Sequence, residues 1–360
     1  MRIKDLFEIN KAITTSREFF DDNKGIPCVH YGDIYRFYNE KTILSSNILN
    51  KFTLNLDKLK TINQDSIIMP DVTETITDFG HLTYIKYDKT QYINGTHTLA
   101  ILNNKNNNLK YLFYYLQSSK IKKQLQTLLL GSTVFQISKK DLENFELQSI
   151  HNENEQQHIV DIIGSLDDKI ENNNKIIEKL WQKLQLVHTD FKSKNELVEK
   201  NILELADIKY GKGIPTSEIL KDGLYSVYGS NGIIGYLNNY TFKEHKIAIS
   251  CRGNSSGIIH LTDENSTVTS NSLVLDFKNF DYTYYFFLEF MYKGLYEYKT
   301  GSAQPQITID NLKILNLQVP KNINDYIKNI NDSVEYTFCL KKENQKLFLL
   351  KQFYLEKFFG

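Results

Sequence analysis

The sequence predicts an α+β fold in which two globular blocks of mixed strands and helices are separated by two long helices packed as an antiparallel coiled coil. The first observation is an internal repeat: the stretch Gly-Ser-Thr-Val-Phe-Gln-Ile-Ser that begins at Gly131 returns as Gly-Ser-Ala-Gln-Pro-Gln-Ile-Thr from Gly301. The second is that each copy leads into a long polar run of helical character, at 155–192 and at 324–359. A repeat of this size indicates one structural unit used twice.

The repeat divides the chain into a first globular block at 1–150, a first spacer helix at 151–199, a second globular block at 200–320 and a second spacer helix at 321–360. The blocks begin with the same apolar spacing and end with the same stretch, but their interiors differ in length and in nearly all their sequence. The shared opening positions are Ile3, Leu6 and Ile9 in the first block and Ile202, Leu205 and Ile208 in the second.

The block interiors predict short strands joined by tight turns, with helices packed on them. In the second block, aromatic and β-branched runs flank glycine-containing turns at 224–236 and again at 246–261, which is the pattern of strand–turn–strand units. The aromatic-rich run 282–298, and 109–130 in the first block, predict helices.

The helix after the first block has the clearest periodicity in the chain. Apolar residues recur in alternating steps of four and three, and Asn173 takes the one place where the pattern calls for another apolar side chain. This is a heptad seam with a polar residue at one core position, a feature that fixes the register of a coiled coil at some cost in stability. The expected coiled-coil core residues are Ile159, Ile163, Leu166, Ile170, Asn173, Ile177, Leu180 and Leu184.

The second long helix is less regular, and its tail from Leu347 to Phe359 is too apolar to lie free in water. We expect the two helices to pack as an antiparallel pair, with apolar surface left over for another protein. We expect the repeated stretch at Gly131 and Gly301 to mark the hinge at which each block joins its helix.

Composition and charge limit the class of protein. Lysine plus arginine and aspartate plus glutamate both number 43, so the formal net charge is zero. Free-standing nucleic-acid binders are more often basic, because phosphate contacts supply most of their non-specific affinity. A DNA-binding surface must therefore be local or completed by a partner. No apolar run reaches the roughly 20 residues of a membrane helix. With no secretory signal and only three cysteines, we expect a cytoplasmic protein without disulfides.

The sequence shows no catalytic motif, and we expect a non-enzymatic chain. A phosphate-binding loop, a nucleophile elbow and an Asn-Pro-Pro-Tyr-like methyltransferase signature are all absent. The glycines at 229–235 suit hairpin turns better than a dinucleotide-binding loop. Cys28 with His30, and Cys251 with His260, lack the spacing of metal ligands, so no metal site is expected.

The remaining features suit recognition of a nucleic acid. Basic, amide and hydroxyl side chains in loops are the types that hydrogen-bond phosphates and base edges. Gln136 and Gln306 have the amide group that pairs with adenine, but a glutamine present in both blocks favours a framework role. The DNA-binding candidates in the second block are Lys212, Tyr228, Ser230, Asn231, Arg252, Asn254, Ser255, Gln304 and Gln306. Those in the first block are Arg17, His30, Tyr31, Arg36, Ser132 and Gln136; for each of them, an ordinary exposed loop residue is the alternative interpretation.

Three stretches together resemble the specificity subunit of type I restriction–modification systems, over essentially the whole chain. The first is Gly-Lys-Gly-Ile-Pro at 211–215 with Tyr-Ser-Val-Tyr-Gly-Ser-Asn-Gly-Ile-Ile-Gly-Tyr at 225–236. The second is the repeated Gly-Ser-x-x-x-Gln-Ile-Ser/Thr, and the third is Gln-Gln-His-Ile-Val-Asp-Ile-Ile-Gly-Ser-Leu-Asp at 156–167. The first block departs from the pattern, with only Lys-Gly-Ile-Pro at 24–27, and the second helix opens with a degenerate copy at 322–327.

The resemblance implies a non-catalytic, sequence-specific DNA-binding subunit of a methyltransferase and restriction endonuclease complex. In that family each globular block is a target recognition domain that reads one half of a bipartite site in double-stranded DNA. The coiled coil sets the spacer and docks two methyltransferase subunits, and motor-nuclease subunits complete the restriction complex. S-adenosylmethionine and ATP would then be cofactors of the partner subunits, and this chain would hold none.

Two other functions stay open at the level of sequence. One is the recognition subunit of a combined restriction-and-modification enzyme, which neighbouring genes would distinguish. The other is a coiled-coil protein-interaction scaffold without a DNA role, which salt-dependent, sequence-specific DNA binding by the assembled complex would contradict. The bases of the target depend on loop geometry and DNA shape and are not readable from the sequence.

Overall fold

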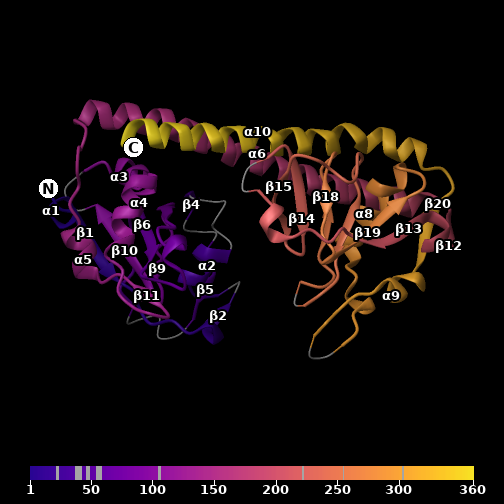
Figure 1. Ribbon diagram of the computed structural model, residues 1–360, viewed down its shortest axis with the longest axis horizontal. Coiled ribbons are helices and arrows are strands. Elements are labelled where there is room, and N and C mark those ends of the chain that lie inside the picture. The colour runs from indigo at the N-terminus through magenta and orange to yellow at the C-terminus, as the bar shows by residue number, and fades with distance from the viewer. Residues whose placement is uncertain are drawn as a thin grey trace. The chain divides into compact units, whose positions relative to one another are not determined.

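The computed structural model describes the chain in segments that together form two compact units (Figure 1). The first unit is Met1–Asn172 with Asn344–Gly360, and the second is Asn173–Glu343. Each unit holds one globular block and part of both long helices, and the predicted boundaries at 150, 199 and 320 stay predictions. The described residues are 1–21, 24–36, 43–45, 49–53, 59–103, 107–220, 223–253, 255–301 and 304–360, without the side chains of Arg17, Arg36, Asp325 and Asn329.

The two long helices are α6, Glu153–Lys194, and α10, Asn324–Phe359. Contacts inside the units pair Asp167 with Lys351, Asn173 with Glu343 and His188 with Tyr326. The partner's number falls along α10 as it rises along α6, so the helices are antiparallel, as predicted (Figure 1). No helix in the described part of the chain is both long enough and apolar enough to cross a membrane.

The heptad residues of α6 lie on its covered side. Asn173 Nδ2 donates a hydrogen bond to Glu343 Oε2 at 2.7 Å, which joins the polar core position to the opposite helix. The stripe also packs on the globular blocks, since Ile163 belongs to the core of the first unit and Leu184 to that of the second. Ile159, Ile163, Asn173 and Leu184 are buried, and Leu166, Ile170, Ile177 and Leu180 are half-buried.

The first unit is built on a five-stranded sheet with the order β1-β10-β6-β8-β4. Alternate residues of its central strand β6 face opposite ways. Ile67 packs with the helices, and Ile68 packs with a smaller cluster on the other face. The strands are β1 Phe7–Lys11, β10 Thr98–Asn103, β6 Ser66–Pro70, β8 Thr83–Lys86 and β4 Ile43–Ser45; only the β4–β8 pair is parallel.

Shorter elements complete the first unit. The predicted helix at 109–130 is two helices, α3 Leu109–Gln117 and α4 Ser119–Gln126, because the backbone of Ser118 is extended. The other strands are β2 Phe20–Asp21, β5 Lys51–Phe52, β3 Ile26–Val29 and β9 Ile93–Asn94 in one sheet, and β7 Val72–Thr73 with β11 Phe135–Gln136. The other helices are α1 Ile3–Leu6, α2 Tyr31–Arg36 and α5 Lys139–Asn144, with 3₁₀ turns at Arg17–Phe19 and Ile76–Asp78.

The second unit has a four-stranded sheet, β13-β19-β16-β17, and a three-stranded sheet, β15-β14-β18. Both predicted strand–turn–strand units are present, as β14–β15 and β16–β17. The helix predicted at 282–298 is present as α8 but ends at Lys293, where Gly294 at positive φ follows. The strands are β13 Ala206–Tyr210, β19 Ser272–Phe277, β16 Ile247–Ser250, β17 Ile259–Leu261, β15 Gly232–Leu237, β14 Tyr225–Gly229 and β18 Thr267–Val268. The pair β12 Leu197–Asn201 and β20 Asn316–Pro320, the helices α7 Ile202–Leu205, α8 Asp281–Lys293 and α9 Ile309–Lys313, and 3₁₀ turns at Thr216–Glu218 and Tyr296–Tyr298 complete it.

The two units share the same framework, including individual hydrogen bonds. Tyr115 Oη donates to the carbonyl oxygen of Gln148 at 3.1 Å, and Tyr285 Oη donates to that of Gln318 at 3.3 Å. Both tyrosines lie on the helix that covers the main sheet, and both glutamines lie between the repeated stretch and the long helix. The repeat in the sequence is therefore a repeat of the fold.

The repeated stretch is a tight turn within each block and not a hinge. Gly131 has φ +136° and Gly301 has φ +87°, a region of backbone space that favours glycine. A Cβ atom on Gly131 would lie 2.1 Å from the carbonyl oxygen of Val134, so no side chain fits there. The long helices begin later, at Glu153 and Asn324, and the expectation of a hinge was wrong.

Candidate nucleic-acid interface

The two repeated turns hold the same place in their units. Gln136 pairs with Val72, and Gln306 pairs with Arg252, in each case through the backbone and just after the central buried strand of the main sheet. Both glutamines thus have a framework contact in common, as their presence in both blocks indicated. The residue opposite each glutamine differs between the units, because Val72 is apolar and buried whereas Arg252 is basic and exposed.

In the second unit, the loops after β14 and β16 meet and bring four candidates together. Ser255 Oγ donates to Asn231 Oδ1 at 2.5 Å, which ties one loop to the other. Ser250 Oγ donates to the carbonyl oxygen of Ser230 at the base of the same pair of loops. Arg252 is exposed beside them. This surface offers guanidinium, amide and hydroxyl groups, which are the donors that read base edges and phosphates.

Lys212 borders these loops and is exposed. Its carbonyl oxygen accepts a hydrogen bond from the backbone of Ser270 at 3.0 Å, and the neighbouring Asn271 accepts one from the backbone of Cys251 at 3.0 Å. Gln304 and Gln306 are exposed on the repeated turn. Asn254 lies outside the described residues.

Tyr228 is not a surface residue, so its position does not support its assignment as a DNA contact. It is 6% exposed and packs with Phe242 and Val268 between the two sheets. Its Oη accepts a hydrogen bond from the backbone of Asp263 at 3.1 Å, and burial raises its pKa. The side chain alternates inward in β14, and the sequence pattern did not show that this face of the strand is covered by a second sheet.

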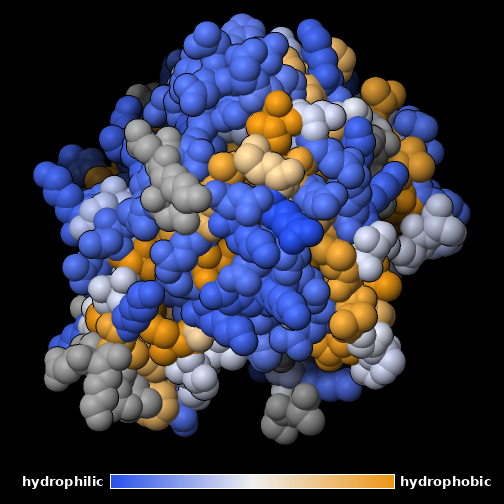
Figure 2. Space-filling view, turned by 90° about the vertical axis from the view of Figure 1, so that its left-hand side faces the viewer, coloured by the Kyte–Doolittle hydropathy of each residue, from blue (hydrophilic) through white to orange (hydrophobic). Residues whose placement is uncertain are grey.

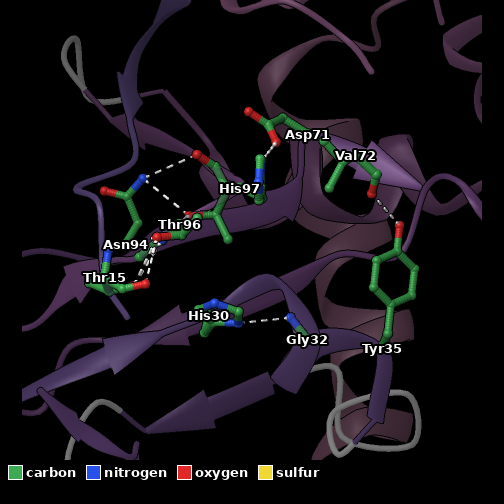
Figure 3. Close-up of polar contacts among 11 residues, drawn as sticks. Thr15, His30, Gly32, Tyr35, Asp71, Val72, Asn94, Thr96 and His97 are labelled. Carbon is green, nitrogen blue, oxygen red and sulfur yellow. Dashed lines mark hydrogen bonds and ion pairs between the residues drawn. The ribbon is translucent and has the colours of Figure 1, made fainter. Parts of the chain in front are cut away.

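In the first unit, His30 is also buried, so its position does not support its assignment as a DNA contact. It is 6% exposed, and its Nδ1 accepts a hydrogen bond from the backbone of Gly32 at 3.2 Å (Figure 3). Tyr31 is half-buried, and Ser132 and Gln136 are exposed on or beside the repeated turn. The backbones of Arg17 and Arg36 are described, but their side chains lie outside the description.

His97 is exposed on the first unit, and the sequence did not indicate it as a candidate. It lies at the tip of the turn between β9 and β10 with φ +58°, an uncommon backbone conformation for a residue with a side chain. Its Nδ1 lies 3.4 Å from Asp71 Oδ1 (Figure 3). The ring of Tyr31 packs edge-on at 5.4 Å between centroids. Thr15 and Thr96 exchange hydrogen bonds of 2.6 and 3.0 Å that brace the turn.

Asp71 lies beside this histidine. Burial raises the pKa of the Asp71 carboxyl, and the nearby His97 and Gln136 side chains offset that effect only in part. The backbone of Asp71 donates to the carbonyl oxygen of His97 at 3.1 Å, as Cys251 does to Asn271 in the second unit. His97 and Asn271 are therefore equivalent positions, each just before the strand that pairs with the central strand. The equivalence becomes visible only when the strand pairing is known.

Cys28 is buried in the first unit, and the described part of the chain shows no cluster of metal-ligating side chains. No group of three or more histidine, cysteine, aspartate or glutamate side chains is placed there to hold a metal ion. Burial, together with the charge of Asp33, raises the pKa of Cys28 to about 12, and a hydrogen bond involving Thr15 opposes this only weakly. The Cys28 thiol therefore stays protonated at neutral pH.

One surface of α10 is apolar and exposed. Phe348, Leu349 and Phe353 are 50%, 59% and 59% exposed, within the helix tail that the sequence marked as too apolar to lie free in water. On the face shown in Figure 2, hydrophilic side chains predominate and hydrophobic ones form separate patches. Exposed apolar side chains that gather on one helix are typical of protein-binding surfaces.

Comparisons with known proteins show which family this arrangement resembles. The family model described as the type I restriction modification DNA specificity domain matches residues 1–182 and 194–349. A curated protein of Mycoplasma genitalium, provisionally named a type I specificity subunit, is 27% identical over 178 residues, which are 45% of this chain and 46% of that protein. The chain thus matches about half the length of this relative.

A solved structure has the same fold. The crystal structure of the type I restriction–modification system S subunit from M. genitalium matches with a TM-score of 0.59 and 18% sequence identity, over 100% of this chain and 95% of that one. The family model covers most of the sequence in two segments, as the duplicated frame requires. The chain belongs to the family of type I restriction modification DNA specificity domains.

Proposed function

We propose that the chain is the non-catalytic specificity subunit of a type I restriction–modification complex, in which each unit reads one half of a bipartite site in double-stranded DNA. The observation that carries the proposal is a shared frame with unlike side chains at equivalent loop positions. Val72 and His97 in the first unit correspond to Arg252 and Asn271 in the second. Two readers built on one frame are suited to two different half-sites.

The chemistry of the second unit supports direct reading of bases. Arginine pairs bidentately with guanine, and asparagine pairs with adenine, in the major groove. Arg252 and Asn231 are exposed at the meeting point of two loops, and the hydrogen bond from Ser255 orients the amide of Asn231. In the first unit, His97 and Tyr31 would make the corresponding contacts with the bases.

The helix pair would dock the methylating partners. Phe348, Leu349 and Phe353 offer an apolar surface on α10, and we assign it to a methyltransferase subunit. Because the frame is repeated, we expect two such subunits, joined by motor-nuclease subunits in the restriction complex. S-adenosylmethionine and ATP would be bound by these partners. They would also supply the positive charge that a chain of zero formal net charge lacks.

A methylation map tests the proposal. The chain is co-expressed with its methyltransferase partner, and methylated adenines are mapped across the genome by long-read sequencing. We expect a bipartite motif with a fixed unspecified spacer, and its loss when the chain is omitted. Methylation that lacks a bipartite motif, or that continues without this chain, would contradict the proposal. Leu349→Gln with Phe353→Gln should abolish assembly and methylation while the isolated chain stays folded.

A further inference from the structure

A basic cleft lies at the open edge of the main sheet of the second unit. Its volume is about 440 Å³. One wall comes from the edge strand β13, and the other comes from the segment between β15 and β16. The cleft is lined by Lys209, Tyr210, Lys212, Thr241, Phe242, Lys243, Glu244, Lys246 and Asp276.

The walls of the cleft hold a cluster of ion pairs. Lys246 Nζ lies 2.7 Å from Asp276 Oδ1 and 3.4 Å from Glu244 Oε2, with its side chain 9% exposed. Lys209 Nζ lies 3.1 Å from Asp276 Oδ2 and 5.0 Å from the centre of the Phe242 ring. These two lysines therefore neutralise the two carboxylates of the cleft.

The rim carries the uncompensated charge. Lys212 and Lys243 are both exposed, and within the described part of the chain neither side chain has an ion pair with a carboxylate. The cleft thus presents two ammonium groups beside a cluster whose charges cancel. An anion that enters between them would meet positive charge without first breaking an existing ion pair.

The fold does not require this cluster, as the first unit shows. The strand registers equate Ile9 with Ile208 and Ile101 with Leu275. One residue after these positions on the same strands, and one residue before the matching position on the antiparallel central strand, the first unit has no charged side chain. Where the second unit has Lys209, Asp276 and Lys246, the first has Asn10, Leu102 and Ser66. These ion pairs are partly exposed, and such pairs add little to stability, so they are not needed for folding.

Lys212 belongs both to the cleft and to the candidate interface. The carbonyl oxygen of Lys212 accepts the hydrogen bond from Ser270, and the adjoining Asn271 accepts the one from Cys251, which precedes Arg252. Lys212 therefore stands between the loops that would read bases and the lysine-rimmed edge. A strand of DNA held at Arg252 would have its backbone continue past this rim.

We propose that the cleft binds phosphates of the DNA backbone beside the half-site that the second unit reads. Lys212 and Lys243 contact the phosphodiester oxygens, and the cluster of Lys209, Lys246 and Asp276 holds the walls of the cleft in place. The site carries no base information and supplies affinity that depends on salt concentration. This inference rests on the proposed DNA-binding function and assigns a ligand to a surface of the same unit.

The test compares Lys212→Gln/Lys243→Gln with the wild type, each as the full chain assembled with its methyltransferase partner. Lys200→Gln is the matched control, because Lys200 is an exposed lysine on β12, outside the cleft. Affinity for a duplex carrying the mapped site is measured at several salt concentrations. Each lost phosphate contact lowers the slope of log K against log salt by about 0.9 in magnitude, so the double variant should lose about 1.8.

Two further readouts locate the effect. In a phosphate-ethylation interference experiment, ethylation of phosphates beside one half-site should weaken DNA binding by the wild type. Ethylation of the same phosphates should have no effect on DNA binding by the double variant. That half-site should be the one whose base preference changes in Arg252→Ala. The methylated motif itself should stay unchanged, because the lost contacts are to the backbone.

An unchanged salt slope and interference pattern in the double variant, with the wild type binding its site specifically, would overturn the cleft assignment and leave the proposed function intact. Failure of the wild type to bind any specific site would overturn the proposed function itself. Inorganic phosphate is tested separately. If it raises the unfolding temperature of the wild type but not of the double variant, and the DNA slope is unchanged, the cleft binds a small anion and the proposal is wrong.

Discussion

The ammonium nitrogen of Lys351 lies 2.7 Å from Asp167 Oδ1 and 3.0 Å from Oδ2, in a position where Lys351 is only 2% exposed. Tyr114 Oη donates to Asp167 Oδ2 at 2.9 Å from α3. One buried carboxylate therefore joins α6, α10 and the globular block of the first unit. In the second unit Glu289 of α8 has a similar role, with His188 and Lys192 of α6 as its partners.

Replacing Lys351 alone should destabilise the chain strongly. Lys351→Met leaves the Asp167 carboxylate buried without its cation, and removing one partner of a buried pair costs about 3–5 kcal/mol. The double variant Asp167→Leu/Lys351→Met should recover most of this loss, because no buried charge remains. Urea unfolding of the isolated chain measures both free energies. A double variant as unstable as the single one would contradict this account of the pair.

Stability should fall in acid because of Glu289. Burial raises the pKa of this carboxyl, but the hydrogen bonds from His188, Lys192 and Lys293 outweigh burial and hold it below its usual value. A carboxylate with a depressed folded-state pKa stabilises the fold above its unfolded pKa of about 4.3, and this contribution is lost as the pH falls below that value.

The check is the free energy of unfolding measured from pH 7 down to pH 3. The wild type should lose stability below about pH 4.3. Glu289→Gln should be less stable at pH 7 and should show a shallower loss over the same range, because it has no carboxylate to protonate. An equally steep loss in both proteins would assign the acid sensitivity to other groups.

Shortening both long helices should shorten the spacer of the recognised site. Removal of residues 170–176 and 340–346 takes one heptad from each helix and removes Asn173 together with its partner Glu343. Seven residues of helix span about 10 Å, which corresponds to roughly three base pairs. The methylation map should keep both half-sites and lose about that many unspecified bases.

Deletion in α6 alone is the control, since it puts the remaining pairs out of register and should abolish complex assembly. A changed half-site sequence in the double deletion would mean that the helices do not act as a spacer.

Single substitutions in the loops should each affect one half-site. Arg252→Ala should relax base preference in the half-site of the second unit, and His97→Ala in that of the first, by about 1–3 kcal/mol per base contact. Tyr228→Phe and His30→Gln serve as controls, because both side chains are buried and should leave the motif unchanged. A motif altered in both halves by either loop variant would show that the units do not read independently.

The long-range pattern of the chain was readable because it depends on periodicity. The heptad spacing from Ile159 to Leu184 predicted α6 and its covered side. The repeated stretch at Gly131 and Gly301 predicted the duplicated frame. The structural role of the repeated stretch was predicted wrongly. A glycine in a tight turn and a glycine at a hinge look the same in a sequence. Only the backbone pairing of Gln136 with Val72 and of Gln306 with Arg252 distinguishes the two cases.

The sequence by itself determined the repeat, the two antiparallel helices and the types of side chain that the loops of the second unit would offer. These follow from spacing and composition, which act along the chain. The tertiary structure decided which side chains reach the surface: it buried Tyr228 and His30, exposed His97, and gathered Lys209, Lys212, Lys243 and Lys246 around one cleft. Burial depends on which face of a strand a second sheet covers, and that is settled by contacts between residues far apart in the chain.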